Sequence, residues 1–319
     1  MENYFKLKNI VDLNVVNKDT KIFESDFCHI TDQNKMYQFE LIEEESNRSI
    51  EVNPGLYKIA VVSNVMKLEE AHFTADEMLN EYTNTEHIEH IIECFFKNLH
   101  LYKEFGIEVP KRNLLLYGPP GGGKSTAIQK AAMKYVGDGK TAVITWDTAA
   151  FEPYEIKEFI SRLNYIGAEK IILIAEDIGG ASNEGLGIRS SSSLLRLLDN
   201  TDKTFTIPVM VIATTNFIGN LEENLANRSG RFDDRIEIGY PSSEDREKLL
   251  RFFAKEYVTE KAAELIKTDK CKKFSVAHIK ECYIRSRLHS KDLDVVIKQV
   301  IKEIEEYNKG FTKNQGMGF

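Results

Sequence analysis

The residues best suited to chemistry lie in the segment GPPGGGKST, which fills the phosphate-binding pattern G-x-x-x-x-G-K-[ST]. In this pattern glycines let backbone N–H groups turn toward phosphate oxygens, the lysine reaches the β and γ phosphates, and a serine hydroxyl ligates Mg²⁺. An apolar run precedes the segment and a helical pattern follows it, so the helix dipole also faces the anion. We therefore predict a nucleoside triphosphate site rather than a turn without a ligand. Its binding residues are Gly118, Pro119, Pro120, Gly121, Gly122, Gly123, Lys124, Ser125 and Thr126.

Two acids form a second candidate group. The apolar run from Ile171 to Ala175 ends in Glu176 and Asp177. Hydrolysis of a bound triphosphate needs a carboxylate near Mg²⁺ and a group that orients water. Glu176 would hold the metal, directly or through water, and Asp177 would polarise the attacking water. The spacing from the phosphate loop favours this over two acids that serve solubility alone.

Asn216 and two arginines extend the candidate site. Asn216 follows the apolar run Val209 to Ala213 and would contact the γ phosphate and orient water beside Asp177. Arg228 and Arg231 would stabilise the charge that develops on a transferring phosphoryl group. If they act across a subunit interface, each active site is completed by its neighbour. The plainer alternative for the two arginines is an exposed, solvated turn.

Strand and helix signals alternate through the part of the chain that carries these residues. Such alternation predicts an α/β fold, a P-loop parallel sheet whose nucleotide site lies at the carboxyl ends of the strands. The expected elements after the phosphate loop are a strand over 142–146, a helix over 155–163, a strand over 170–175, a helix over 193–198 and a strand over 207–214.

Four regions are expected in chain order. Residues 1–85 show short β-rich runs and predict an N-terminal substrate or partner domain with a helical linker. Residues 86–241 hold the large α/β domain, residues 242–308 read as a helical lid, and residues 309–319 as a flexible tail.

Two groups of histidine and cysteine residues have the chemistry of metal ligands but lack a complete ligand set. Cys28 and His29 are adjacent without a further ligand at metal spacing. His87, His90 and Cys94 share one stripe of a predicted helix, beside its apolar face. Because no fourth ligand is evident, we interpret them as surface residues.

Composition narrows the function classes. The 319 residues carry a net charge of -8 and an isoelectric point near 5.6, so nothing basic invites a nucleic acid. The four cysteines lack C-x-x-C spacing, which favours a reduced, cytoplasmic setting. We expect no membrane segment, since no apolar run approaches about 20 residues.

From about Phe95 to Val295 the chain resembles AAA-type ATPases. GPPGGGKS matches Walker A, ILIAED matches Walker B, ATTN matches sensor 1, and NRSGRFDDRIEIGYPS matches the segment with arginine fingers. The resemblance implies ATP and Mg²⁺ as cofactors and a homo-oligomeric ring, of six subunits, with fingers acting in trans. It implies Lys124 with Ser125 or Thr126 at phosphate and metal, Glu176 as the metal acid, Asp177 as the catalytic acid, Asn216 as sensor, and Arg228 with Arg231 as fingers.

A narrower resemblance covers the run from Phe96 to Ile107, which is similar to the entry segment of the mitochondrial translocase of the Rieske iron–sulfur protein and its bacterial relatives. Those proteins also tend to carry Glu-Asp where most AAA proteins have Asp-Glu. The membrane anchor of the mitochondrial protein has no counterpart in this sequence.

The chain also departs from the family pattern. Asp177 is one methylene shorter than the usual glutamate, so water activation is expected to be slower or its geometry adjusted. Gly122 stands where threonine is usual. In the lid, Val276 and His278 differ from the usual Ser-Gly-Ala-Asp, and neither Arg285 nor Arg287 is assigned as a second sensor.

We expect an ATP-hydrolysing oligomer that remodels, unfolds or translocates a protein client. The alternatives are an ATP-gated assembly scaffold and a nucleic-acid motor or loader. Pore loops stay open: Phe151 and Tyr154 either grip a substrate or pack on the following helix, and the Gly- and Ser-rich loop from Ile178 to Ser193, which contains Arg189, is a second candidate.

Overall fold

The computed structural model describes residues 5–12, 27–32, 35–41, 50–62, 65–73, 84–147, 156, 159–178, 198, 205–216, 218 and 232–314. The chain divides into two compact units, residues 1–51 with 162–164 and residues 52–161 with 165–319. The first unit contains an antiparallel sheet of order β1-β3-β2. Its strands are β1 (Phe5–Asp12), β2 (Phe27–Asp32) and β3 (Lys35–Leu41). The β-rich character expected at this end of the chain is therefore present.

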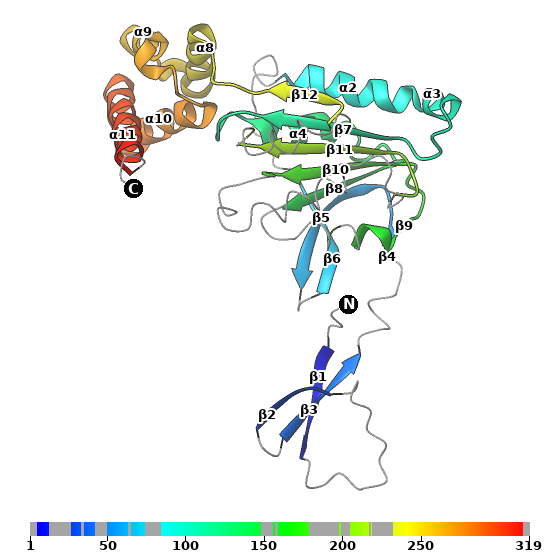
Figure 1. The fold of residues 1–319 in the computed structure, drawn as a ribbon. Coiled ribbons are helices and arrows are strands. Elements are labelled where there is room, and N and C mark those ends of the chain that lie inside the picture. The colour runs from blue at the N-terminus through cyan, green and yellow to red at the C-terminus, as the bar shows by residue number, and fades with distance from the viewer. Residues whose placement is uncertain are drawn as a thin grey trace, which may run out of the picture. The chain divides into compact units, whose positions relative to one another are not determined.

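The second unit is built on a sheet of seven strands within the described residues (Figure 1). Every neighbouring pair is parallel except β5 with β6. The α/β class with a mostly parallel sheet is confirmed. In spatial order the strands are β12 (Asp234–Glu237), β7 (Lys111–Tyr117), β11 (Val209–Thr215), β10 (Lys170–Glu176), β8 (Thr141–Asp147), β5 (Gly55–Val62) and β6 (Val65–Glu70).

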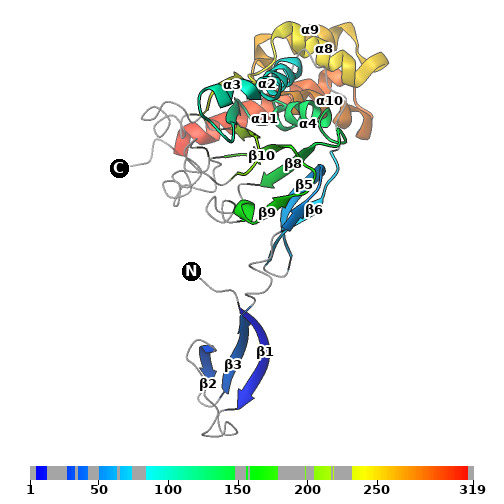
Figure 2. The ribbon, with the colours of Figure 1, turned by 90° about the vertical axis from the view of Figure 1, so that its right-hand side faces the viewer.

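Strands β5 and β6 lie in the large sheet, at its edge (Figure 2). β5 pairs with β8 in parallel, from Gly55 opposite Ala142 to Lys58 opposite Thr145. We expected residues 55–70 in the N-terminal domain, so the sheet begins earlier in the chain than that expectation placed it. Alternating side chains identify a strand but not its partner, because pairing joins residues far apart in sequence. The domain limits at residues 241 and 308 stay predictions.

One short segment differs from its expected form. The helix expected over residues 155–163 is described at Ile156 and from Phe159 to Ser161, and strand β9 (Leu163–Tyr165) follows. β9 pairs with β4 (Ile50–Val52) in a separate two-stranded sheet. The helix therefore ends before Leu163, because that residue is taken into a strand.

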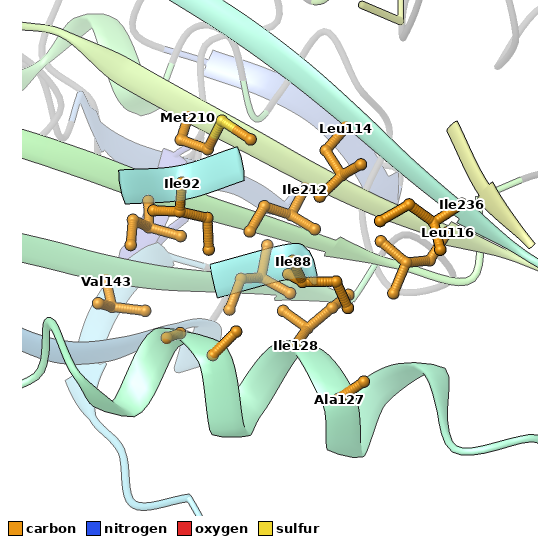
Figure 3. Close-up of a cluster of buried hydrophobic side chains, with 14 of the residues drawn as sticks. Ile88, Ile92, Leu114, Leu116, Ala127, Ile128, Val143, Met210, Ile212 and Ile236 are labelled. Atoms are coloured by element: carbon orange, nitrogen blue, oxygen red, sulfur yellow. The ribbon is translucent and has the colours of Figure 1, made fainter. Parts of the chain in front are cut away.

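Helices α2 (Thr85–Lys97) and α4 (Lys124–Met133) pack into the same core as the sheet, and α3 (Leu99–Glu104) follows α2. In Figure 3, Ile88 and Ile92 of α2 face Ile128 of α4 and side chains of the central strands. All three isoleucines are fully buried. The apolar face predicted for the helix that carries His87, His90 and Cys94 thus faces the interior.

The C-terminal part of the second unit is helical and has its own apolar core (Figure 1). It comprises α8 (Ser243–Ala254), the short 3₁₀ turn η3 (Lys255–Tyr257), α9 (Glu260–Lys267), the turn η4 (Asp269–Cys271), α10 (Val276–Leu288) and α11 (Leu293–Asn314). Ser242 caps α8 by accepting a hydrogen bond from the Asp245 amide. The predicted helix start at this point is confirmed, and so is the helical character of the expected lid.

Arg246 ties these helices together from inside. Its buried guanidinium donates hydrogen bonds to the carbonyls of Pro241, Ile266, Lys267 and Thr268 at 2.8 to 3.2 Å. Three of these carbonyls lie at the C-terminal end of α9, where a helix leaves acceptors without intrahelical donors. The arginine thus joins α8, α9 and the segment that leaves the sheet.

Truncating Ile92 should destabilise the second unit. We expect Ile92→Ala to lower the free energy of unfolding by about 2 to 5 kcal/mol, because a fully buried aliphatic side chain leaves both lost apolar contact and a cavity. Urea unfolding followed by circular dichroism measures the change. His87→Ala, at an exposed position of the same helix, is the matched control and should unfold close to wild type. Equal loss in both variants would contradict the packing described for α2.

Candidate nucleotide site

Three neighbouring parallel strands bring the predicted residues together. β7 leads into the glycine-rich loop, β10 ends at Glu176 and leads into Asp177, and β11 leads into Asn216. In the register, Tyr117 of β7 lies opposite Thr215 of β11, and Ala175 of β10 lies opposite Ala213. Because parallel strands end at the same edge, residues separated by about a hundred positions share one site.

The loop backbone needs glycine at defined points. Gly118, Gly121 and Gly123 have φ angles of 146°, 71° and 96°, a region that other residues rarely adopt. A Cβ atom at Gly118 would lie 2.0 Å from the carbonyl oxygen of Ile238, just beyond β12. The Ile238 amide in turn donates to Tyr117 at 2.8 Å. The start of the loop is therefore pressed against the chain that extends β12.

Lys124 is the centre of the site. Its ammonium donates to the carbonyls of Gly118 at 2.8 Å and Pro119 at 2.9 Å and to Oδ1 of Asn216 at 2.6 Å. The side chain is buried. Burial lowers the pKa of this lysine, and the negative charge of Asp177 acts in the opposite direction. A desolvated ammonium held by carbonyl oxygens can exchange those partners for phosphate oxygens, which carry full charge.

Ser125 and Glu176 meet across the site. The Ser125 hydroxyl donates to Oε2 of Glu176 at 3.1 Å. Both are hard oxygen donors, the kind that Mg²⁺ prefers, and Mg²⁺ at nucleotide sites takes one or two protein ligands beside phosphate and water. The pair thus fits the metal of a bound nucleotide. Among the described residues no group of three or more His, Cys, Asp or Glu could hold a metal by itself, and His90 and Cys94 contact each other on α2 without a third ligand in such a group.

Asp177 is linked to the same network through Asn216. Nδ2 of Asn216 donates to Oδ1 of Asp177 at 2.8 Å, while Oδ1 of Asn216 accepts from Lys124. The amide of Asp177 donates to the Thr214 hydroxyl at 2.8 Å. Asp177 is exposed to solvent. The structure therefore places Lys124, Asn216 and Asp177 in one chain of hydrogen bonds.

The start of α10 lies directly against the loop. The Ala277 amide donates to the Gly121 carbonyl at 3.1 Å, and a Cβ atom at Gly121 would lie 2.8 Å from both Ala277 Cβ and Ser275 Oγ. Gly121 is thus fixed by two demands, its positive φ and this close approach. The helical end of the chain touches the phosphate loop through backbone.

His278, which departs from the family pattern, belongs to the cap of α10. Ser275 is the N-cap, and His278 accepts the Ser275 amide on Nδ1 at 3.1 Å while donating its own amide to Ser275 Oγ at 3.4 Å. Burial lowers the pKa of His278, and the charge of Arg285 lowers it further. A neutral imidazole is the form that can accept the Ser275 amide, so the histidine replaces an acid in the capping box.

The two lid arginines that we left unassigned have partners within the helical part. Arg285 forms ion pairs with Glu281 at 2.9 Å and Glu303 at 2.8 Å. The guanidinium of Arg287 lies 3.9 Å from the centre of the Tyr257 ring. Both contacts lie within the helical part of the chain.

Some predicted site residues lie outside the described residues. Arg228 and Arg231 are among them, as are the candidate pore-loop residues Phe151, Tyr154 and Arg189, and their roles stay predictions.

The chain just after the arginine segment is firmly attached to β7. Asp233 accepts the Asn113 amide at 2.7 Å and donates its own amide to the Asn113 carbonyl at 2.9 Å. Asp234 pairs with Arg112 at 2.8 Å, and this contact raises the pKa of the guanidinium. The end of the segment is thus anchored beside the strand that leads into the loop.

Four residues in contact with the site were not singled out from sequence. Thr214 and Thr215 contact the residues after β10, and Ile238 and Ala277 contact the loop. The sequence could have indicated the two threonines, because buried hydroxyls at the end of an otherwise apolar strand need hydrogen-bond partners. Ile238 and Ala277 act through their backbones, so their side chains carried no signal.

None of the described helices has the length and apolar character needed to cross a membrane.

Comparison with known proteins shows that part of the chain is similar to a known family of ATPases. Residues 114–240 match the model of the ATPase family associated with various cellular activities (AAA). The proteasome-activating nucleotidase of Sulfurisphaera tokodaii is 31% identical over 214 residues, 61% of this chain and 51% of the relative. The 26S proteasome regulatory subunit 8 homolog of Schizosaccharomyces pombe is 29% identical over 228 residues, 66% of this chain and 54% of the relative. The human ATPase family gene 2 protein homolog A is 38% identical over 181 residues, 51% of this chain and 20% of the relative. The chain spans about half the length of the first two.

Removing the Lys124 ammonium should weaken triphosphate binding. We expect Lys124→Ala to raise the dissociation constant of a fluorescent ATP analogue by about 30-fold or more, because losing one partner of a desolvated charge pair costs about 2 to 5 kcal/mol. Lys134→Ala, at the other end of α4 in an exposed pair with Glu89, is the matched control and should bind like wild type. Retained affinity in Lys124→Ala would show that the loop is not a phosphate site.

Proposed function

Because residues 114–240 form a domain of the AAA ATPase family, we propose that this chain hydrolyses ATP with Mg²⁺ and works as an oligomeric protein-remodelling motor. The observation that carries the proposal is the hydrogen-bonded chain from Lys124 through Asn216 to Asp177 beside the Ser125–Glu176 pair. In this proposal these contacts bring together a cation that binds phosphate, two ligands for the metal and a carboxylate that activates water. Together they are the parts that phosphoryl transfer to water requires.

In this proposal the loop from Gly118 to Thr126 binds the triphosphate. Its backbone N–H groups and the N-terminus of α4 face the phosphates, and Lys124 leaves the loop carbonyls to contact the β and γ phosphates. Ser125 and Glu176 hold Mg²⁺, Glu176 directly or through water. When bound, the metal supplies Lewis-acid stabilisation of phosphate charge. The half-buried Ser125–Glu176 pair keeps those two ligands at the correct distance from each other before nucleotide arrives.

Asp177 and Asn216 act on the attacking water. Asp177 is exposed, and its carboxylate accepts a hydrogen bond from the water. Asn216 contacts the γ phosphate and holds the Asp177 carboxylate in place. Because Asn216 also binds Lys124, arrival of the γ phosphate changes both of its contacts. Asn216 thus links the presence of the third phosphate to the orientation of the acid. Arg228 and Arg231 complete the site from a neighbouring subunit in the proposed ring of six.

A protein client is favoured over a nucleic acid. Two of the relatives named above are a proteasome-activating nucleotidase and a homolog of a 26S proteasome regulatory subunit, and the net charge of -8 gives no electrostatic attraction for a phosphate backbone. We place the ring in the cytoplasm, with a protein client brought to it through the N-terminal β-rich domain. The narrower similarity to Rieske-protein translocases stays a prediction.

A second function, an ATP-gated assembly scaffold, is favoured by one observation. The carboxylate that should activate water belongs to an aspartate, Asp177, which is one methylene shorter than the glutamate usual in the family. A scaffold would hydrolyse slowly and release its partner when the nucleotide changes. The two functions share the site and differ in turnover.

ATPase assays with added polymers separate the candidates. We expect turnover of the assembled protein to rise several-fold with an unfolded polypeptide such as casein and to stay unchanged with single-stranded DNA or RNA, because the surface charge repels polyanions. Stimulation by nucleic acid alone would overturn the remodelling function. Turnover that stays negligible with every polymer, while ATP binds, would identify the scaffold.

Mixed assemblies test whether arginines act between subunits. We expect Arg228→Ala and Asp177→Asn to bind ATP while each loses about 100-fold or more in turnover, since each removes transition-state stabilisation. Mixed in equal amounts, the two variants should recover part of the wild-type turnover, because some sites receive an intact acid from one subunit and an intact arginine from its neighbour. Lys124→Ala mixed with Asp177→Asn is the control and should recover none. No recovery in the first mixture would argue for action within one subunit.

A further inference from the structure

We infer that Thr214 is a positioning residue for hydrolysis: its hydroxyl holds the backbone of Asp177 in the conformation that directs the carboxylate to Asn216. The inference rests on the proposed ATPase function and extends it to a residue that contacts neither nucleotide nor metal in that proposal. The Asp177 backbone has a left-handed conformation, its amide bonds to Thr214, and its carboxylate bonds to Asn216.

The backbone at Asp177 is unusual. Its φ angle is 55°, in the left-handed region that residues with a Cβ atom occupy at a conformational cost. The residue directly follows the last residue of β10, Glu176, so the chain bends where the acid stands. A strained residue persists only where its surroundings hold it, and such residues gather at functional sites.

Consecutive residues of β11 provide those contacts. The Thr214 hydroxyl accepts the Asp177 amide at 2.8 Å, and the Thr214 carbonyl accepts the Ile178 amide at 2.7 Å. The Thr215 hydroxyl donates to the Ile178 carbonyl at 2.7 Å. The amide that bonds to Thr214 Oγ1 belongs to Asp177 itself, the residue with the left-handed backbone. The next two bonds fix the residue that follows.

The threonines lie where water has little access. Thr214 is 3% exposed and Thr215 is fully buried. Water competes little with a hydrogen bond accepted by such a buried hydroxyl, so the loss of this bond costs more than the loss of a bond in water. Removing only the Thr214 hydroxyl should therefore release the left-handed turn.

The same strand end also holds the side chain of the acid. Asn216, two residues after Thr214, donates to Oδ1 of Asp177 and accepts from Lys124. The peptide from Thr214 to Asn216 thus fixes Asp177 by backbone and by carboxylate. Because aspartate is short, its carboxylate position follows its backbone closely.

Valine and serine at position 214 separate the hydroxyl from the shape of the side chain. Thr214→Val keeps the volume and removes the hydrogen-bond acceptor, and Thr214→Ser keeps the hydroxyl. At saturating ATP we expect Thr214→Val to lower kcat about tenfold or more and to change KM for ATP less than about threefold, because the group acts on the transition state and not on binding. Thr214→Ser should stay within about threefold of wild type in both constants.

A matched control accounts for the general effect of losing a buried hydroxyl. Thr141, fully buried in β8 of the same sheet, donates its hydroxyl to Asp138 at 2.7 Å. Thr141→Val should lower thermal stability and leave kcat unchanged. Wild-type kcat in Thr214→Val would overturn the inference, as would an equal loss of kcat in Thr214→Val and Thr214→Ser.

Amide hydrogen exchange tests the contact without relying on turnover. In the wild-type chain the Asp177 amide should exchange slowly, and in Thr214→Val about tenfold or more faster, while Leu173 in the middle of β10 stays as protected as in wild type. Unchanged exchange at Asp177 would overturn the inference whatever the activity. A wild-type chain that exchanges as expected but has no turnover would instead refute the proposed ATPase function and leave the backbone contact supported.

Discussion

The buried ammonium of Lys124 is the interaction on which the rest of the site depends. An ammonium with little access to water needs oxygen atoms around it, and here the oxygens come from two loop carbonyls and from Asn216. That requirement draws the loop after β7 and the end of β11 to one point. Since Asn216 also binds Asp177, the same charge indirectly orders the acid at the end of β10.

The parallel sheet makes this convergence possible, and two further contacts hold the loop from outside. Gly118 is pressed against the backbone of Ile238, which extends β12, and Gly121 is pressed against the first turn of α10. The loop therefore lies between the sheet and the helical part of the chain. A nucleotide that moves the loop must act on both, and the bond from Ala277 to Gly121 is the direct connection to the lid.

Much of the fold and site could be predicted because the signals are local. The apolar runs that become β8, β10 and β11, the stripe on α2 and the glycine-rich loop depend on residues within a few positions of each other. The membership of β5 and β6 in the large sheet could not be read in this way, since strand pairing is decided by distant segments. The left-handed backbone of Asp177 was also hidden, because it is stabilised by a hydroxyl from another strand.

The sequence by itself determined which chemistry is available: a lysine and a serine in a phosphate loop, two acids after an apolar strand, and a polar residue after the next. Residue type and spacing carry that information because charge and hydrogen-bonding capacity belong to the side chains. Only the tertiary structure decided how these groups are joined, with Asn216 between Lys124 and Asp177, Thr214 under the acid, and His278 in the cap of the helix that touches Gly121. Those relations depend on distances of a few ångströms between elements far apart in the chain, which packing sets and local pattern does not.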